Sequence, residues 1–183
     1  MKPEDSGEPP SRKEFKQALS ALSRDELIKL VGSLYSVSPD NRRFLEARFA
    51  LAAPLEPYKK IIRDAVHPDV MKGTAPISFA AARKAIGDYR KATGDQKGVL
   101  ELMVHAVECG NAFTVEYGDI DGRFYDSLES LFRKTVQVLK TMDGPTTEAY
   151  LPRLEAVVEA ASGIGWGYHD GIADALAEAF PPD

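Results

Sequence analysis

The sequence predicts an all-α fold, either a compact bundle or a short array of antiparallel helical hairpins, with about seven to nine helices. Three observations predict it. Apolar residues recur with the 3.6-residue period of a helix along most of the chain. Residues that favour helix N-caps precede many of these stretches. Alternation of apolar and polar residues, as a strand requires, is confined to short ambiguous pieces such as residues 113–117.

The first two helices are predicted by paired capping residues. Ser11 with Glu14, and Ser23 with Glu26, have the spacing of a capping box. The second box precedes a helix with an apolar face at helical spacing, formed by Leu27, Leu30, Val31, Leu34 and Tyr35. Residues 1–10 precede the first box, are polar and include three prolines, so we expect a disordered tail there.

Proline and glycine mark most of the later boundaries. Ser38 and Pro39 begin a third helix; Pro54 and Pro57 interrupt it and begin a fourth, and Pro68 ends the fourth helix. A loop over residues 71–76 precedes a helix that Ser78 caps and a glycine ends at position 94. The remaining predicted helices cover residues 97–117, 123–142 and 147–161, followed by the turn at 163–167 and a last helix that ends at residue 180.

Size and composition predict one domain over residues 11–183. Cys109 is the only cysteine, so no internal disulfide can form, and a cytoplasmic location is expected. No apolar stretch is long enough for a membrane span, and the N-terminus lacks the apolar core of a secretory signal. The sequence contains no hydrolase elbow, P-loop or H-E-x-x-H pattern and implies no cofactor.

Charge is distributed unevenly along the chain. Residues 42–97 carry 12 basic and 6 acidic side chains, a net charge of +6, whereas residues 98–183 carry 5 basic and 15 acidic ones, a net charge of −10. Residues 1–41 are nearly neutral, with 6 basic and 7 acidic side chains. Such asymmetry favours association, within the fold, across a homodimer or with another protein.

The central helix carries the best candidate for a metal site. Glu101, His105 and Glu108 lie at positions i, i+4 and i+7 and therefore share one face. Carboxylates and imidazoles on facing helices can bind a metal ion. His169 and Asp170 would complete the site if the turn before them packs against this helix. The alternative is that the stripe is the solvated side of an otherwise apolar helix.

The turn GIGWG, residues 163–167, also has a purely structural interpretation. Its three glycines permit a tight backbone turn. In that interpretation, Trp166 and Tyr168 anchor the turn in the core, and Asp170 caps the last helix. Asp119 and Asp121, in the loop YGDIDG, do not fit the register of a calcium loop and are predicted to cap the following helix.

Two basic groups could bind phosphate. They comprise Lys59 and Lys60 on one helix, and Arg83, Lys84, Arg90 and Lys91 on another. The alternative is that both groups form solvated faces of core helices, diluted by nearby aspartates. The acidic sequence pI of 5.3 argues against nucleic-acid binding. Cys109 follows Glu108, whose charge disfavours a reactive thiolate, so a buried structural cysteine is expected.

Six stretches together resemble an uncharacterised bacterial family, domain of unknown function 6155. They are DELIKLVGSLY (25–35), YKKIIRD (58–64), RKAIGDYRKATGD (83–95), VECGNAFTVEYGDID (107–121), FYDSLESLF (124–132) and GIGWGYHD (163–170). The resemblance implies a small, mainly helical, bacterial cytoplasmic protein. It implies no activity, cofactor or catalytic residue.

Three functional hypotheses follow. The first is a helical interaction or regulatory module that binds a protein partner or forms a homo-oligomer, because the charge asymmetry comes without a catalytic motif. The second is a metal-binding protein or metal-dependent enzyme that uses Glu101, His105, Glu108, His169 and Asp170. The third is a phosphate or nucleic-acid binder that uses the six basic residues.

Overall fold

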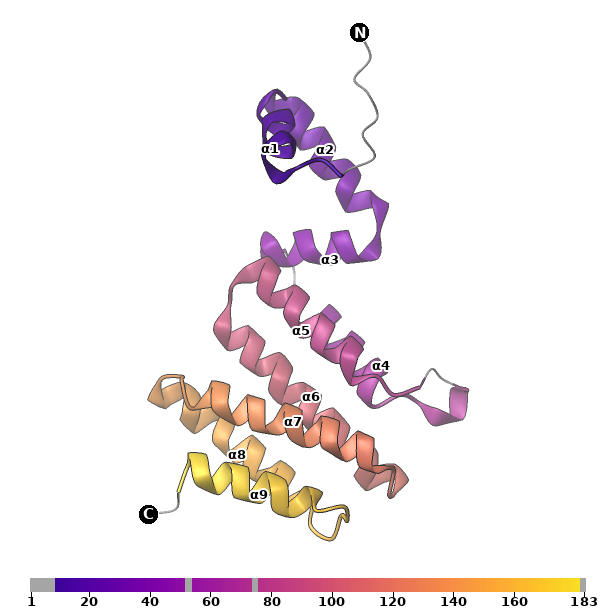
Figure 1. The fold of residues 1–183 in the computed structure, drawn as a ribbon, viewed down its shortest axis with the longest axis vertical. Coiled ribbons are helices and arrows are strands. Elements are labelled where there is room, and N and C mark those ends of the chain that lie inside the picture. Colours follow the sequence, from indigo (N-terminus) through magenta and orange to yellow (C-terminus); the bar gives the residue numbers. More distant parts are fainter. Residues whose placement is uncertain (1–8, 52–53, 74–75, 182–183) are drawn as a thin grey trace. The chain divides into compact units, whose positions relative to one another are not determined.

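The computed structural model describes residues 9–51, 54–73 and 76–181, and this part of the chain is all-helical (Figure 1). The all-α prediction is confirmed, with nine α-helices, one 3-10 helix and no strand among those residues. The α-helices are α1 (Arg12–Ser20), α2 (Arg24–Val37), α3 (Pro39–Arg48), α4 (Glu56–Val66), α5 (Phe79–Thr93), α6 (Gln96–Tyr117), α7 (Gly122–Leu139), α8 (Gly144–Ala160) and α9 (Tyr168–Ala179).

The chain divides into two compact units, residues 1–45 and residues 46–183, and the boundary falls within α3. The sequence predicted one domain over residues 11–183, and that expectation stays a prediction. The expected tail over residues 1–10 lies mostly outside the described residues. Residues 74–75 of the expected loop over residues 71–76 also lie outside the described residues, and its first two residues, Met71 and Lys72, belong to the 3-10 helix Val70–Lys72.

The first unit contains α1, α2 and the start of α3. Both predicted capping boxes are present: Ser11 and Glu14 begin α1, and Ser23 and Glu26 begin α2. In each box, the serine hydroxyl accepts a hydrogen bond from the glutamate amide, and the glutamate carboxylate accepts one from the serine amide. Neither α1 nor α2 contains a buried residue. The capping boxes therefore stabilise the starts of two helices that form no hydrophobic core of their own.

The second unit is built around α6. This helix contacts α4 and α5 as well as α7 and α8, while α9 packs against α7 and α8 (Figure 1). More than half of its residues are buried, because neighbours cover most of its circumference. Among the described residues, no helix combines the length and the apolar composition that crossing a membrane requires.

Close packing of α6 depends on a glycine at position 110. A Cβ atom built on Gly110 would lie 2.7 Å from Cδ1 of Leu128 on α7, so the absence of a side chain lets the two helices approach. The predicted ends of α5 and α6 are confirmed. Gly94 follows α5 in the left-handed conformation, with φ of 70°, and Gly118 follows α6.

Candidate functional site

The predicted Glu/His/Glu stripe of α6 is covered by neighbouring helices, and its two carboxylates bind cations from them. Glu101 pairs with Lys59 of α4 at 2.8 Å and with Arg153 of α8 at 2.6 Å. Arg153 also donates two parallel hydrogen bonds to Glu108, each 2.7 Å long. The Glu101 side chain is only 15% exposed. We call Lys59, Glu101, Glu108 and Arg153 the ion-pair belt, because they connect α4, α6 and α8.

The belt holds Glu101 in its ionised form. Burial raises the pKa of the Glu101 carboxyl. Hydrogen bonds and positive charge from Arg153 and Lys59 together lower the pKa by more than burial raises it, so the net pKa is below the ordinary value of 4.5. Hydrogen bonds from its guanidinium to Glu108 are the main reason that the pKa of Arg153 is raised. A metal ion at this stripe would therefore have to displace a bidentate guanidinium.

His105 lies on the same stripe but faces α4 and Cys109. Its Nε2 is 3.3 Å from the backbone oxygen of Lys59 and 3.5 Å from Sγ of Cys109. Burial lowers the pKa of His105 and raises the pKa of the Cys109 thiol. The uncharged forms are therefore favoured, and the predicted burial of Cys109 is confirmed.

Among the described residues, no hydrogen bond or ion pair connects His169 with Glu101, His105 or Glu108. His169 Nδ1 is 3.2 Å from Oδ1 of its neighbour Asp170. One interpretation expected Asp170 to cap α9. Instead, the N-cap of α9 is Gly167, which makes no side-chain hydrogen bond to the helix. Within the described part of the chain, no group of three or more His, Cys, Asp and Glu side chains is placed to hold a metal ion.

The predicted basic residues are largely distributed into separate pairs. Lys60 pairs with Asp64, and Lys84 and Lys91 both pair with Asp88. Part of the charge asymmetry is thus neutralised locally. Three further pairs, Lys59–Glu101, His67–Glu116 and Lys97–Asp143, link the basic middle segment to the acidic segment within the fold.

Two of the predicted basic residues do come together, in a groove between α5 and α7. Arg83 and Arg90 of α5 line it with Lys134 of α7, over a hollow of about 210 Å³. Arg83 also donates a 3.0 Å hydrogen bond to the backbone oxygen of Ser127. Sequence reasoning missed Lys134 because it is more than 40 residues away, on a helix whose face toward α5 cannot be read from local spacing.

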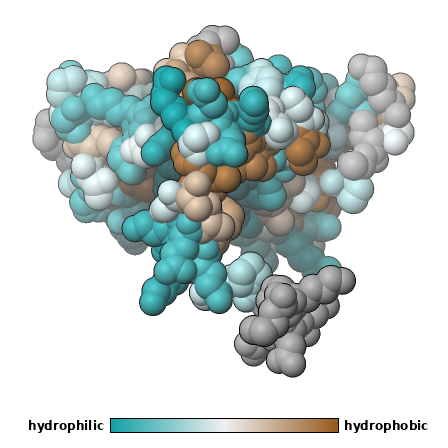
Figure 2. All heavy atoms as spheres, turned by 90° about the horizontal axis from the view of Figure 1, so that it is seen from above, coloured by the Kyte–Doolittle hydropathy of each residue, from teal (hydrophilic) through white to brown (hydrophobic). Residues whose placement is uncertain are grey.

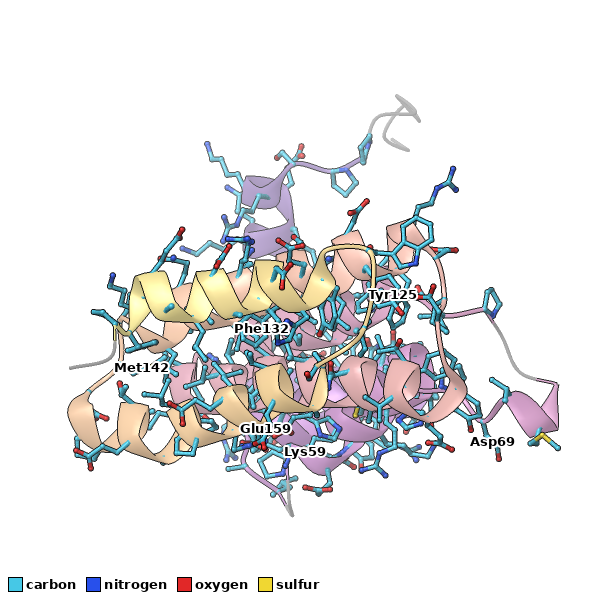
Figure 3. The ribbon with its side chains drawn as sticks, turned by 90° about the horizontal axis from the view of Figure 1, so that it is seen from below. Lys59, Asp69, Tyr125, Phe132, Met142 and Glu159 are labelled. Carbon is cyan, nitrogen blue, oxygen red and sulfur yellow. The ribbon has the colours of Figure 1, made fainter. Side chains whose placement is uncertain are left out.

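The loop YGDIDG and the turn GIGWG meet at Asp119. Its carboxylate accepts a 2.9 Å hydrogen bond from Trp166 Nε1 and a 2.8 Å bond from the Tyr125 hydroxyl. Tyr125 Oη is also 2.6 Å from Thr114 Oγ1 at the end of α6. We call Thr114, Asp119, Tyr125 and Trp166 the Asp119 junction. Figure 3 shows Tyr125 near the turn before α9 and well apart from Lys59, so the junction and the ion-pair belt are separate.

This geometry corrects two expectations about the segments. Asp121 does cap α7, accepting a 2.8 Å bond from the Phe124 amide, but Asp119 binds side chains instead. Tyr168 is fully buried as expected, whereas Trp166 is 64% exposed and does not enter the core. Trp166 has a left-handed backbone, with φ of 63°, and bonds to the exposed Asp119, whereas the Tyr168 hydroxyl bonds to the buried Asn111.

The first unit carries an exposed apolar surface. Residues of α2 at helical spacing remain accessible, from 36% at Leu27 to 73% at Val37. Leu30, Val31 and Leu34 lie between these limits, and Phe15 of α1 is also exposed. Figure 2 shows hydrophobic residues, coloured brown, at the surface on the side that it views. An amphipathic helix with an unburied apolar stripe is typical of a binding surface.

Comparison with known proteins adds no relative. No family model, no curated protein and no solved structure matches this chain. The resemblance to domain of unknown function 6155 stays a prediction.

Proposed function

We propose that this chain is a helical interaction module that self-associates through the apolar face of α2. One observation supports the proposal most directly: α2 carries large apolar side chains at helical spacing, yet neither α1 nor α2 has a buried residue. Burying each such side chain is worth about 1.5–3 kcal/mol, which a second protein surface can supply.

A second copy of the same helix is the best candidate for the partner. Leu27, Leu30, Leu34 and Val37 are spaced by three, four and three residues, the a/d spacing of a seam in which identical helices interdigitate. Residues 1–41 carry 6 basic and 7 acidic side chains, so two copies would meet without strong repulsion. In this respect residues 1–41 differ from residues 98–183, whose net charge of −10 would make two copies repel each other.

The test is sedimentation velocity of the full chain over concentrations from about 1 to about 200 µM. We expect a dimer at the upper end, and a monomer throughout for the double variant Leu30→Glu/Leu34→Glu. The matched control is Gly32→Glu/Ser36→Glu, which adds the same charge at the same spacing on the side of α2 opposite the apolar stripe; a Cβ atom on Gly32 would meet no neighbour within 4 Å. This control should keep the dimer.

Three outcomes would overturn self-association. A wild-type chain that stays monomeric at about 200 µM lacks the proposed interface. If the control variant dissociates the dimer as the leucine variant does, the cause is the added charge and not the loss of the apolar face. A dimer that survives both double variants would place the interface elsewhere. Circular dichroism of each variant separates loss of association from loss of α2.

Metal binding by Glu101, His105, Glu108, His169 and Asp170 is the alternative function. The bidentate pairing of Arg153 with Glu108 works against it, because that carboxylate already has a cationic partner. Native mass spectrometry of protein purified without chelator tests it. The proposal of an interaction module expects the bare chain or its multiples. A stoichiometric metal mass that His105→Ala abolishes would favour the alternative.

We also propose a cytoplasmic location for this chain. The lone cysteine supports it, since Cys109 is buried and can form no internal disulfide. Fractionation of cells that express the full chain tests the location. Recovery in a secreted or membrane fraction would contradict it.

A further inference from the structure

The Asp119 junction borders a pocket that the proposed self-association does not use. The pocket has a volume of about 430 Å³, within the range of small-molecule sites. Its walls come from the end of α6, the end of α8 and the turn GIGWG; the lining includes Val115, Asp119 and Ile164. Two of the stretches that resemble one family, residues 107–121 and 163–170, thus form most of one hollow.

The carboxylate at this pocket is fixed and ionised. One Asp119 oxygen accepts a hydrogen bond from Trp166 and the other accepts one from Tyr125, and the Ile120 amide also interacts with the carboxylate. A carboxylate has about four lone-pair sites, so it can still bind a ligand. The bond from Trp166, followed by that from Tyr125, lowers the pKa of Asp119 below its ordinary value. The group is therefore held in one orientation with its negative charge in place.

The backbone around the pocket adds to the negative potential. Thr114 and Gly118 belong to the last turn and C-cap of α6, and Ala160 is the last residue of α8. Helix C-termini carry partial negative charge, because their last carbonyl groups lack partners within the helix. Asp119 is the only charged side chain among the residues that line the pocket. A cation is the ligand that this combination favours.

Trp166 directly follows the lining residue Gly165 and has a costly backbone conformation. Its φ is +63°, a left-handed value that is rare outside glycine, and its side chain stays 64% exposed. The ring lies over Gly122, where a Cβ atom would be 3.5 Å from the indole carbons. The turn thus keeps an aromatic ring at the surface with its N–H directed at Asp119. Backbone strain of this kind clusters at binding sites.

We propose that this pocket binds a small organic cation, an aliphatic ammonium whose charged group pairs with Asp119 and whose short apolar part contacts Val115 and Ile164. Because the site is open to solvent and provides one carboxylate, its affinity for simple ammonium compounds lies in the millimolar range. A metal ion is a poorer occupant, since it would need further oxygen or nitrogen ligands.

The sequence provides its own probe, because Trp166 is the only tryptophan. Choline is titrated into the full chain at constant ionic strength while tryptophan fluorescence is recorded. We expect a saturable change. The neutral analogue 3,3-dimethyl-1-butanol, which has the same shape without the charge, should give none at equal concentration. Isothermal calorimetry provides a second readout that does not depend on the indole.

Two variants and one control locate the site. Asp119→Asn removes the charge and should weaken choline binding at least tenfold. Val115→Lys should weaken it as well, because a tethered ammonium would compete for Asp119; Val115 is 54% exposed, so this change leaves the core intact. Asp126→Asn removes an exposed carboxylate of α7 outside the pocket and should leave the affinity unchanged.

Three results would overturn the proposal. The first is the absence of a saturable choline signal by both methods. The second is equal binding of the neutral analogue, which would make the pocket merely apolar. The third is equal weakening by Asp126→Asn and Asp119→Asn, which would reduce the effect to overall charge. Thermal unfolding of each variant confirms that the comparison is made between folded proteins.

Discussion

Replacing Arg153 with methionine is the most direct test of the ion-pair belt. The substitution keeps a long apolar stem but removes the guanidinium that bonds to Glu101 and Glu108. Glu101 would retain Lys59 as its partner, at 2.8 Å. Glu108 would lose both of its hydrogen bonds from Arg153. The variant should therefore destabilise the second unit by leaving partly buried carboxylates with fewer partners.

The magnitude follows from the exposure of the groups. A hydrogen bond to a charged group contributes about 1.5–3 kcal/mol when it is shielded from solvent. Arg153 and Glu108 are about one third exposed, at 32% and 33%, so water replaces part of what they lose. We expect a loss of about 2–3 kcal/mol in unfolding free energy, or about 5–10 °C in Tm. Lys60→Met, which breaks an exposed pair with Asp64, should cost less than about 0.5 kcal/mol.

The pH dependence of this loss has a defined sign. The folded-state pKa of Glu101 is below its ordinary value of 4.5, so its ion pairs stabilise the fold above that pH. The contribution disappears as the pH falls through the folded pKa and the carboxylate is protonated. The difference between wild type and Arg153→Met should therefore be full at pH 7 and shrink only below pH 4.5, as the pH falls through the lowered folded pKa of Glu101.

Urea unfolding followed by circular dichroism at several pH values measures both quantities. The predicted role of the belt fails if Arg153→Met and Lys60→Met cost the same free energy, because the belt would then contribute no more than a set of surface pairs. It also fails if the cost of Arg153→Met stays the same from pH 7 down to the acid unfolding of the protein. A double-mutant cycle of Arg153→Met with Glu108→Gln gives the coupling energy of the pair itself.

The remaining predictions concern packing, the thiol and the apolar face. Gly110→Ala should destabilise the fold by about 1–3 kcal/mol, because its Cβ would lie 2.7 Å from Leu128 Cδ1. Gly87→Ala, in α5 with open space around the new methyl group, should stabilise by about 0.5–1 kcal/mol; chemical unfolding of both checks the opposite signs. Cys109 should react with iodoacetamide far more slowly in the native protein than in urea, as mass spectrometry would show, because it is 8% exposed and its thiol pKa is raised by burial. Leu34→Glu alone should lower the dimer fraction in sedimentation without changing helix content.

Local features of the fold were predictable because short stretches of sequence determine them. Both capping boxes, the caps at Ser78 and Asp121, and the stop at Gly94 depend on residues within one helical turn of each other. The helix expected over residues 97–117 is α6, which runs from residue 96 to residue 117. Helix ends were less accurate where no strong cap is present, as at the end of α7 near residue 139.

The environment of side chains was much harder to predict. Glu101 and Glu108 were identified as a polar stripe, but their partner Arg153 is 45 residues or more away along the chain. Trp166 was expected to anchor the glycine turn in the core, although it has a left-handed backbone and its side chain is exposed. One signal was available: two carboxylates on one face of a helix that is otherwise apolar require a cation from a neighbour.

The separation of Arg153 from its partners has a consequence for folding kinetics. Helices α4 to α7 pack mainly against helices that are close to them in sequence, and such contacts form quickly. The bonds from Arg153 close loops of 45 and 52 residues. Because closing such loops costs conformational entropy, these bonds form only when α8 docks. Variants of Arg153 should therefore leave the refolding rate nearly unchanged and accelerate unfolding. The ion-pair belt therefore forms late in folding, and it determines the unfolding rate of the second unit more than its folding rate.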